Sequence, residues 1–223
     1  MALHWREAGL DRLRQTVTGV TAEAVSDRNV KIVVAARLAA PGQDGGIAVA
    51  YTYTIVGSGD VLIDTSLTPQ GDLPPLPRVG LQMTLPGAYN RFTWYGRGPH
   101  ESYDDRKESA MVGVYTGSVD EQYVPYIYPQ ENGNKTDVRW LALTGAGGAG
   151  LLVVGEPLVN VSAHHFTTAD LEKATHRHLL KRRRDITLNV DYRQCGLGSA
   201  SCGPGPLPDY VIWPKPLSFR VRL

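Results

Sequence analysis

The sequence predicts an antiparallel all-β fold with many strands and one short helix. Segments with the apolar alternation of strands recur at short spacing, hairpin turns separate them, and only one segment has helical character. The 24 glycines and 15 prolines among 223 residues exceed the roughly 12% share of an average protein, which suits a fold with many turns. A βα-barrel is excluded, because it needs eight alternating helices and usually about 250 residues.

The predicted strands follow one another along the chain. Residues 30–38 alternate apolar and other side chains as a half-buried strand does. Residues 47–56 and 61–69 predict a hairpin, because the stretch between them is a glycine-rich turn. The proline cluster at 73–77 is a rigid extended link that leads directly into another strand. We predict the remaining strands at 79–85, 91–96, 138–144, 150–155, 185–191 and 218–223.

The one predicted helix covers residues 167–182. Thr167 stands three residues before Asp170, which is the spacing of a capping box at a helix N-terminus. Three side chains would share one face of this helix: Leu171, Ala174 and His178. The basic run 181–184 would then lie at the helix C-terminus, where the dipole favours cations, so we interpret it as a solvated helix end and not as a nucleic-acid site.

Charge and composition exclude several classes of partner. The formal net charge is +1, so nothing indicates a nucleic acid, a membrane surface or a polyanionic substrate. The N-terminus is charged and lacks the apolar region of a signal peptide, and no run approaches the ~18 apolar residues of a spanning helix. We expect a soluble, cytoplasmic protein with one domain over residues 1–223. The two cysteines, Cys195 and Cys202, fit reduced thiols in a cytoplasm, and whether they pair is left open.

The segment 94–107, WYGRGPHESYDDRK, is the first candidate for catalysis. Paired carboxylates about 5 Å apart can hydrolyse glycosides. Asp104 and Asp105, however, are adjacent and would point to opposite faces of a strand. Glu101 has three cations near it in the sequence, which would neutralise it: Arg97, Arg106 and Lys107. The segment therefore predicts a loop held by its own salt bridges.

The histidines do not predict a metal site. His176 and His178 are two positions apart and would face different directions on a helix, whereas helical zinc ligands are usually four apart. His164 and His165 precede the helix, and both cysteines are distant in the sequence. We expect structural or capping histidines, with no metal and no cofactor.

Two polar segments are compatible with sugar binding. Residues 129–134, PQENGN, combine carboxylate, amide and glycine groups, but this composition is also typical of a tight turn, which we favour. Residues 196–210 hold too many glycines and prolines for regular structure and predict a long loop, which in a compact domain is often functional. Cys202 has no histidine near it in the sequence, so we interpret it as a contact residue and not a nucleophile.

Six motifs in order resemble the C-terminal domain of family 2 β-galactosidases, which also occurs as the separate small chain of two-subunit β-galactosidases. The motifs are HWREAGLDRL, LPRVGLQMTL, WYGRGPHESYDDRK, YVPYIYPQENGNKTDVRW, SAHHFTTADLEKATHRHLL and VDYRQCGLGSASCGP. The resemblance covers nearly the whole chain. It implies a large antiparallel β-sandwich of the galactose-mutarotase type.

The resemblance also implies a function. Both catalytic glutamates of the family lie in a separate βα-barrel, so no catalytic residue is expected here. The loop matching residues 198–204 forms part of the galactoside pocket, which gives the expected substrate-binding residues: Ser201, Cys202, Gly203 and Pro204. Some members have a tryptophan about where Cys202 stands, and cysteine would weaken that stacking contact. The motif at 94–107 is a structural signature in the family, so Glu101 and Asp104 are expected to organise a loop.

Family members have a further strand upstream of the HWREAG motif. We therefore expect an abbreviated N-terminal edge in this chain, with an exposed sheet edge or apolar face.

The function expected from these observations is a non-catalytic β-galactosidase domain or small subunit that completes the site of a catalytic large chain or barrel domain. A free-standing mutarotase-like aldose epimerase is an alternative, with His164 or His165 as acid and Glu131 as base. A carbohydrate-binding module or a pure assembly domain is a further one. The galactoside and the oligomeric state, including a possible homo-oligomer, are left open.

Overall fold

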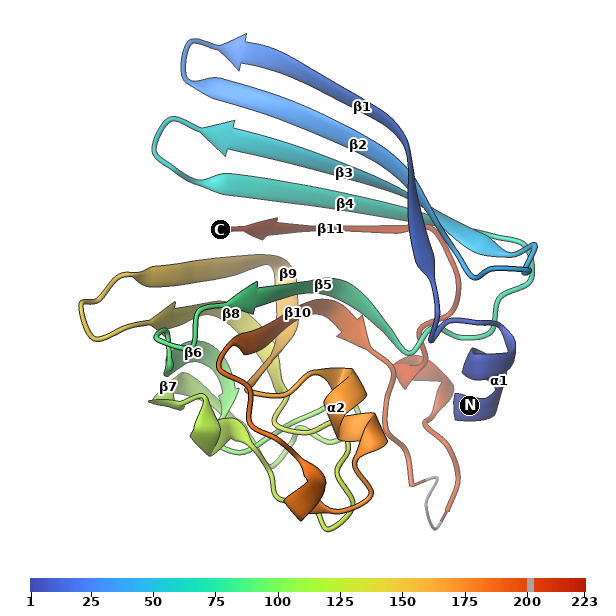
Figure 1. Ribbon diagram of the computed structural model, residues 1–223, viewed down its shortest axis with the longest axis vertical. Helices are drawn as coiled ribbons and strands as arrows, with labels where there is room; N and C mark the ends of the chain where they lie inside the picture. The colour runs from blue at the N-terminus through green and yellow to red at the C-terminus, as the bar shows by residue number, and fades with distance from the viewer. Residues whose placement is uncertain (200–202) are drawn as a thin grey trace. The chain divides into compact units, whose positions relative to one another are not determined.

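The computed structural model describes residues 1–199 and 203–223 (Figure 1). Within these residues it contains eleven strands, two short α-helices and three 3-10 turns. All the strand pairs described below are antiparallel. The prediction of a large antiparallel all-β fold is therefore confirmed. No helix in the described part of the chain combines the length and apolar character needed to cross a membrane.

The chain divides into two compact units. The first contains Met1–Pro77 and Val211–Leu223, and the second contains Arg78–Tyr210. This division does not test whether residues 1–223 form a single domain, so the single domain remains a prediction.

The first unit is a five-stranded sheet in the order β1-β2-β3-β4-β11. Its elements are α1 (Ala2–Glu7), β1 (Arg14–Ser26), β2 (Asn29–Ala39), β3 (Gly46–Val56), β4 (Val61–Gln70) and β11 (Leu217–Arg222). The predicted hairpin is present, with Ile55 of β3 opposite Val61 of β4. One face of the sheet is buried near β11, where Val221 lies opposite Ile63 and Phe219 opposite Thr65.

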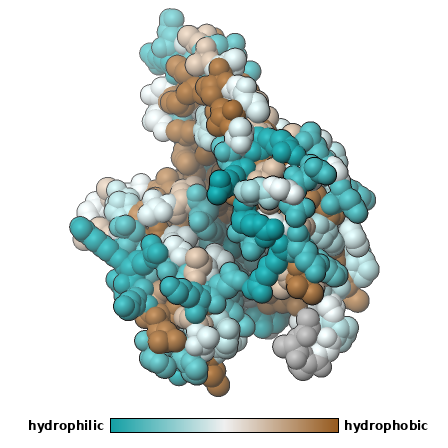
Figure 2. Space-filling model, turned by 45° about the vertical axis from the view of Figure 1, so that its right-hand side comes forward, coloured by the Kyte–Doolittle hydropathy of each residue, from teal (hydrophilic) through white to brown (hydrophobic). Residues whose placement is uncertain are grey.

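Strand β1 lies at the edge of this sheet, beside β2 (Figure 1). All 13 of its residues are exposed, so it lacks the buried alternation by which a strand is recognised in a sequence. That explains why β1 was missed. Apolar side chains at this end of the unit reach the surface, as Figure 2 shows at the top of the view. They include Val17, Val20, Val25, Val30 and Ile55.

The second unit is a six-stranded sheet in the order β5-β10-β9-β8-β6-β7. Its strands are β5 (Arg78–Leu85), β6 (Arg91–Gly98), β7 (Met111–Ser118), β8 (Lys135–Thr144), β9 (Gly150–His164) and β10 (Ile186–Gln194). Its core contains Phe92 and Trp94, whose rings stack with centroids 4.9 Å apart. Leu141, Val161 and Leu188 are fully buried as well. Strand β7 is not among the predicted strands, and none of its residues is buried.

The helix α2 (Thr168–Lys173) begins as predicted but is shorter than predicted. The capping box is present: the Asp170 amide donates to the Thr167 hydroxyl at 3.1 Å, and the Thr167 amide donates to the Asp170 carboxylate at 2.8 Å. Ala174 is already extended, with φ −81° and ψ 120°. His178 therefore lies outside the helix, in a 3-10 turn (Arg177–Leu179).

The basic run 181–184 is consequently not a helix end. Arg183 pairs with Asp170 at 2.5 Å and Arg182 pairs with Asp120 at 2.7 Å. The Arg183 contact brings the chain back onto the first turn of α2, which is compatible with a short helix but not with one that continues to residue 182.

Candidate functional site

The acidic pair of the signature segment lies in a tight turn between Tyr103 and Arg106. The Tyr103 amide donates to the Arg106 carbonyl at 3.1 Å and the Arg106 amide donates to the Tyr103 carbonyl at 2.7 Å. Asp104 and Asp105 occupy the two positions between them. The expectation that they point to opposite faces of a strand is therefore wrong, because the backbone turns here.

Glu101 holds two other segments through its buried carboxylate. It accepts hydrogen bonds from the Gly133 amide at 2.7 Å, from the Arg106 guanidinium at 2.5 Å and from the Tyr126 hydroxyl. Gly133 belongs to the PQENGN segment. Glu101 thus organises loops, as the resemblance implied, and both of its oxygens are engaged.

Of the three cations near Glu101 in the sequence, only Arg106 is seen to pair with it. Arg97 and Lys107 instead bind Asp137, at 2.6 Å and 3.1 Å. Arg97 also donates to the carbonyls of Lys107 and Ala110, each at 3.0 Å. The expected neutralisation of Glu101 by all three cations is wrong, because β8 brings a second carboxylate, Asp137, within their reach.

A second buried ionic cluster lies where β5 and β10 pair. Arg78 contacts the Asp191 carboxylate and pairs with Glu131 at 3.2 Å. Gln194 donates to Asp191 at 2.9 Å and to Asn134 at 3.0 Å. Burial raises the pKa of both Asp191 and Glu131, against the lowering effect of Arg78. Glu131, the candidate base of the alternative function, is therefore engaged with Arg78.

The two adjacent histidines are held by backbone and amide groups. His164 is 4% exposed, and its Nε2 donates to the Asn132 carbonyl at 2.8 Å. Burial lowers the pKa of His164, which favours the neutral ring. The Nδ1 and Nε2 atoms of His165 lie 3.2 Å from the Asp185 carbonyl and 3.3 Å from Asn90 Oδ1. No cluster able to hold a metal ion occurs among the described residues.

Lys135 is the most deeply buried cation of the second unit, at 2% exposure. Its Nζ lies 5.1 Å from the centre of the Trp94 ring, in a cation–π contact. Burial lowers the pKa of Lys135 to about 8.

The predicted loop 196–210 is fastened at its base. The Gly196 amide donates to the Tyr210 carbonyl at 2.7 Å, and the Gly198 amide donates to Asp105 Oδ2 at 2.6 Å. Within the loop, the Ser199 amide donates to the Pro204 carbonyl at 2.8 Å. Of the four expected substrate-binding residues, Gly203 and Pro204 are exposed. The other two, Ser201 and Cys202, lie outside the described residues.

Glycine is required at the base of this loop for two reasons. Gly198 has φ +60°, a backbone conformation that other residues rarely adopt. A Cβ on Gly196 would lie 2.8 Å from the Asp105 carboxylate and 2.7 Å from Tyr210 Cβ. The close approach of Asp105 therefore depends on a glycine at 196.

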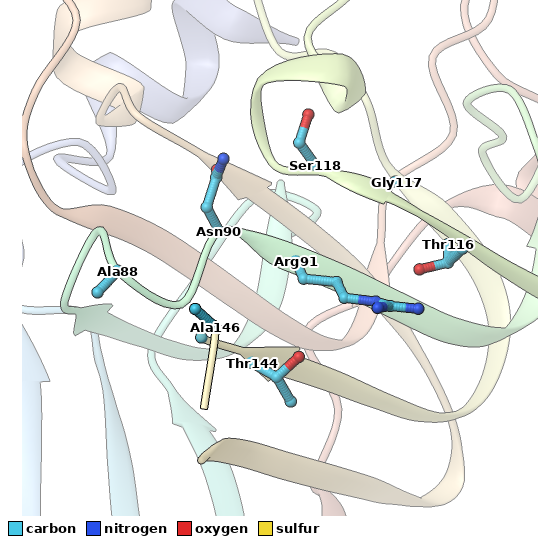
Figure 3. A pocket seen from close by; sticks show the side chains of 9 residues that line it. Ala88, Asn90, Arg91, Thr116, Gly117, Ser118, Thr144 and Ala146 are labelled. Carbon is cyan, nitrogen blue, oxygen red and sulfur yellow. The ribbon is translucent and has the colours of Figure 1, made fainter. Parts of the chain in front are cut away.

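Two hollows lie elsewhere in the second unit. The first, of about 500 Å³, is lined by Ala88, Asn90, Arg91, Thr116, Gly117, Ser118, Thr144, Gly145 and Ala146. Figure 3 shows the Arg91 side chain extending towards Thr116. The second, of about 560 Å³, shares Ala88 and includes Arg182, Arg184 and Asp185. Neither is lined by an aromatic ring, by Gly203 or by Pro204, so neither matches the expected sugar site.

The fold and the contacts of the acidic residues define the class of protein. The chain is an all-β protein in which Glu101, Glu131 and Asp191 are paired with arginines. It carries a glycine-rich loop that is hydrogen-bonded to the signature turn. Residues 2–223 match the model of the family described as beta galactosidase small chain. The chain therefore belongs to the beta-galactosidase small chain family.

The curated relatives are longer proteins named beta-galactosidase. The chain is 40% identical over 211 residues to that of Priestia megaterium, which covers 94% of this chain and 20% of the relative. It is 38% identical over 221 residues to that of Vibrio cholerae (98% and 21%), and 32% identical over 228 residues to that of Kluyveromyces lactis (99% and 22%). The chain thus spans about a fifth of the length of these relatives.

A solved structure is also similar, that of a GalM/aldose epimerase homologue from C. elegans. The TM-score is 0.43 at 13% sequence identity, over 91% of this chain and 67% of that one.

Proposed function

We propose that this chain is a non-catalytic domain or small subunit of a family 2 β-galactosidase, and that it completes the galactoside pocket of a catalytic βα-barrel supplied by a partner chain or domain. The observation that carries the proposal is the family match over residues 2–223, together with relatives named beta-galactosidase in which the matched part is about a fifth of the protein. The substrate would be a terminal β-galactoside and the location cytoplasmic.

The state of the carboxylates supports a non-catalytic role. Retaining glycosidases need two carboxyl groups about 5 Å apart, one free to attack and one free to donate a proton. Here Glu101 accepts three hydrogen bonds, and Asp191 and Glu131 share Arg78. These three carboxylates are engaged in hydrogen bonds and ion pairs within the chain, which speaks against a role as nucleophile or proton donor.

The contribution to binding would come from the fastened loop. We propose that Ser201, Cys202, Gly203 and Pro204 line one wall of the pocket. Exposed apolar side chains lie in the same segment, Leu197 at 41% and Leu207 at 67% exposure. They are suited to contact with the barrel, because large exposed apolar groups often mark interaction surfaces.

The test is hydrolysis of a chromogenic β-galactoside by the purified chain, first alone and then mixed with the catalytic large chain of a related enzyme. We expect no hydrolysis by the chain alone and activity on mixing. Hydrolysis by the chain alone at a rate typical of an enzyme would overturn the proposal, and so would the absence of any gain on mixing despite formation of a complex.

A further inference from the structure

Two adjacent carboxylates of the signature turn reach the same distant loop from its two sides. Asp105 binds the loop near its start, at Gly198, and Asp104 acts near its end, at Asp209, through Arg193. This arrangement follows from the tight turn at Tyr103–Arg106, which directs both side chains to one region.

The contact of Asp105 is direct. Its Oδ2 accepts the Gly198 amide proton at 2.6 Å, a charge-assisted hydrogen bond of the stronger kind. Its other oxygen, Oδ1, is buried and has no hydrogen-bond partner among the described residues. A carboxylate oxygen left without a partner is unfavourable, so Asp105 is poorly explained by its contribution to stability alone.

The contact of Asp104 is indirect. Asp104 Oδ2 lies 3.5 Å from Arg193 Nε, and the Arg193 guanidinium donates to the Asp209 carbonyl. The Gly196–Tyr210 hydrogen bond closes the base of the loop between these two anchors. The segment 196–210 is thus held at both ends by one dipeptide of the signature.

We propose that Asp105 is a positioning residue for the galactoside loop, supported by Asp104 through Arg193. This inference rests on the proposed function, because it assigns the position of the binding residues in that same site. Asp105 contacts the loop backbone at Gly198, so its removal would displace Gly203 and Pro204 without removing a reacting group. The loss falls on substrate binding more than on the chemical step.

The first measurement uses the isolated chain and amide hydrogen exchange at Gly198. We expect protection in the wild type, its loss in Asp105→Ala and partial retention in Asp105→Asn, because the amide keeps one carbonyl acceptor. Glu108→Ala is the matched control, since Glu108 is an exposed acid directly after the signature segment, with no ion pair seen in the described part of the chain. Unchanged exchange at Gly198 in Asp105→Ala would overturn the anchor.

The second measurement uses the chain assembled with the catalytic large chain. We expect Asp105→Ala to raise KM about 10- to 100-fold with a much smaller change in kcat, the range of a lost charged hydrogen bond. Asp105→Asn should recover part of this loss, Asp104→Ala should have a smaller effect, and Glu108→Ala none. A fall in kcat at unchanged KM, or wild-type kinetics in Asp105→Ala, would contradict the positioning role.

The two measurements separate this inference from the proposed function. An active assembly with wild-type KM in Asp105→Ala refutes the positioning role and leaves the proposed function standing. An inactive wild-type assembly refutes the proposed function and with it the role in galactoside binding, while the exchange at Gly198 still decides whether Asp105 anchors the loop.

Discussion

In the second unit, one arginine, Arg78, pairs with two acidic residues, Glu131 and Asp191. Asp191 is 3% exposed and its carboxylate is neutralised by Arg78, which also pairs with Glu131. A buried ion pair is weak support for stability as a whole, but removing one partner leaves the other charge uncompensated. Arg78 holds two carboxylates at once, so its loss affects both.

We expect Arg78→Ala to lower the free energy of unfolding by about 3 kcal/mol. Arg91→Ala is the control, because Arg91 is exposed and shows no ion pair in the described part of the chain; it should change stability by less than about 0.5 kcal/mol. Urea denaturation followed by circular dichroism measures both. A loss below about 1 kcal/mol in Arg78→Ala would show that the cluster is not a stability determinant.

The buried Lys135 predicts a pH dependence of stability. Its pKa is lowered from 10.5 to about 8 by burial, so between these pH values the unfolded chain binds the proton and the folded chain does not. Stability therefore rises with pH through this window, by at most about 3 kcal/mol. Below about pH 8 both states are protonated and the contribution is constant.

Lys135→Met should abolish this rise, because the substitution removes the titrating group and retains most of the side chain's volume. The measurement is the difference in unfolding free energy between wild type and Lys135→Met at pH 7.5, 9 and 10.5. A difference that does not change across these pH values would contradict the burial effect on Lys135.

At the scale of elements, the edge strand β1 of the first unit differs in exposure from its neighbours β2, β3 and β4. Strands β2, β3 and β4 each contain buried residues, and in β4 buried positions alternate with less buried ones. Strand β1 has no buried residue, although it pairs with β2 from Arg14 to Ser26. An unpaired, apolar strand edge is a template for association with another strand.

We expect the isolated chain to self-associate through β1, and Val20→Lys to weaken this association about tenfold or more. Val20 is 61% exposed and lies opposite Val34. Leu152→Lys is the control: Leu152 is 53% exposed but lies on β9, which pairs with β8. Sedimentation equilibrium measures both, and a wild-type chain that stays monomeric at all concentrations would refute the expectation.

At the scale of the whole molecule, the chain supplies binding groups and not reacting groups under the proposed function. Replacing residues 201–204 in an assembled enzyme should raise KM more than it lowers kcat. Glu108→Ala, at an exposed position outside the loop and outside the proposed contacts, should leave KM within about twofold of wild type. Steady-state kinetics on a chromogenic galactoside decide this, and equal losses in kcat at constant KM would count against a binding role.

The sequence by itself determined the all-β class, most of the buried strands and the capping box of α2, because these depend on local periodicity and on residues three positions apart. It also contains the six motifs that resemble the beta-galactosidase family. The exposed strands β1 and β7 were missed, because their side chains carry no burial pattern. The helix is predicted too long, because the chain becomes extended at Ala174 although the helical pattern of the sequence continues beyond it.

Only the tertiary structure decided what the signature acids do. Asp105 and Gly198 are 93 positions apart, and Arg78 and Asp191 are 113 apart. No periodicity or spacing in the sequence indicates which carboxylate meets which donor over such separations. The pairing of β5 with β10 and the turn at Tyr103–Arg106 settle it, because hydrogen bonds and ion pairs require atoms within about 3 to 4 Å and only the folded chain brings those atoms together.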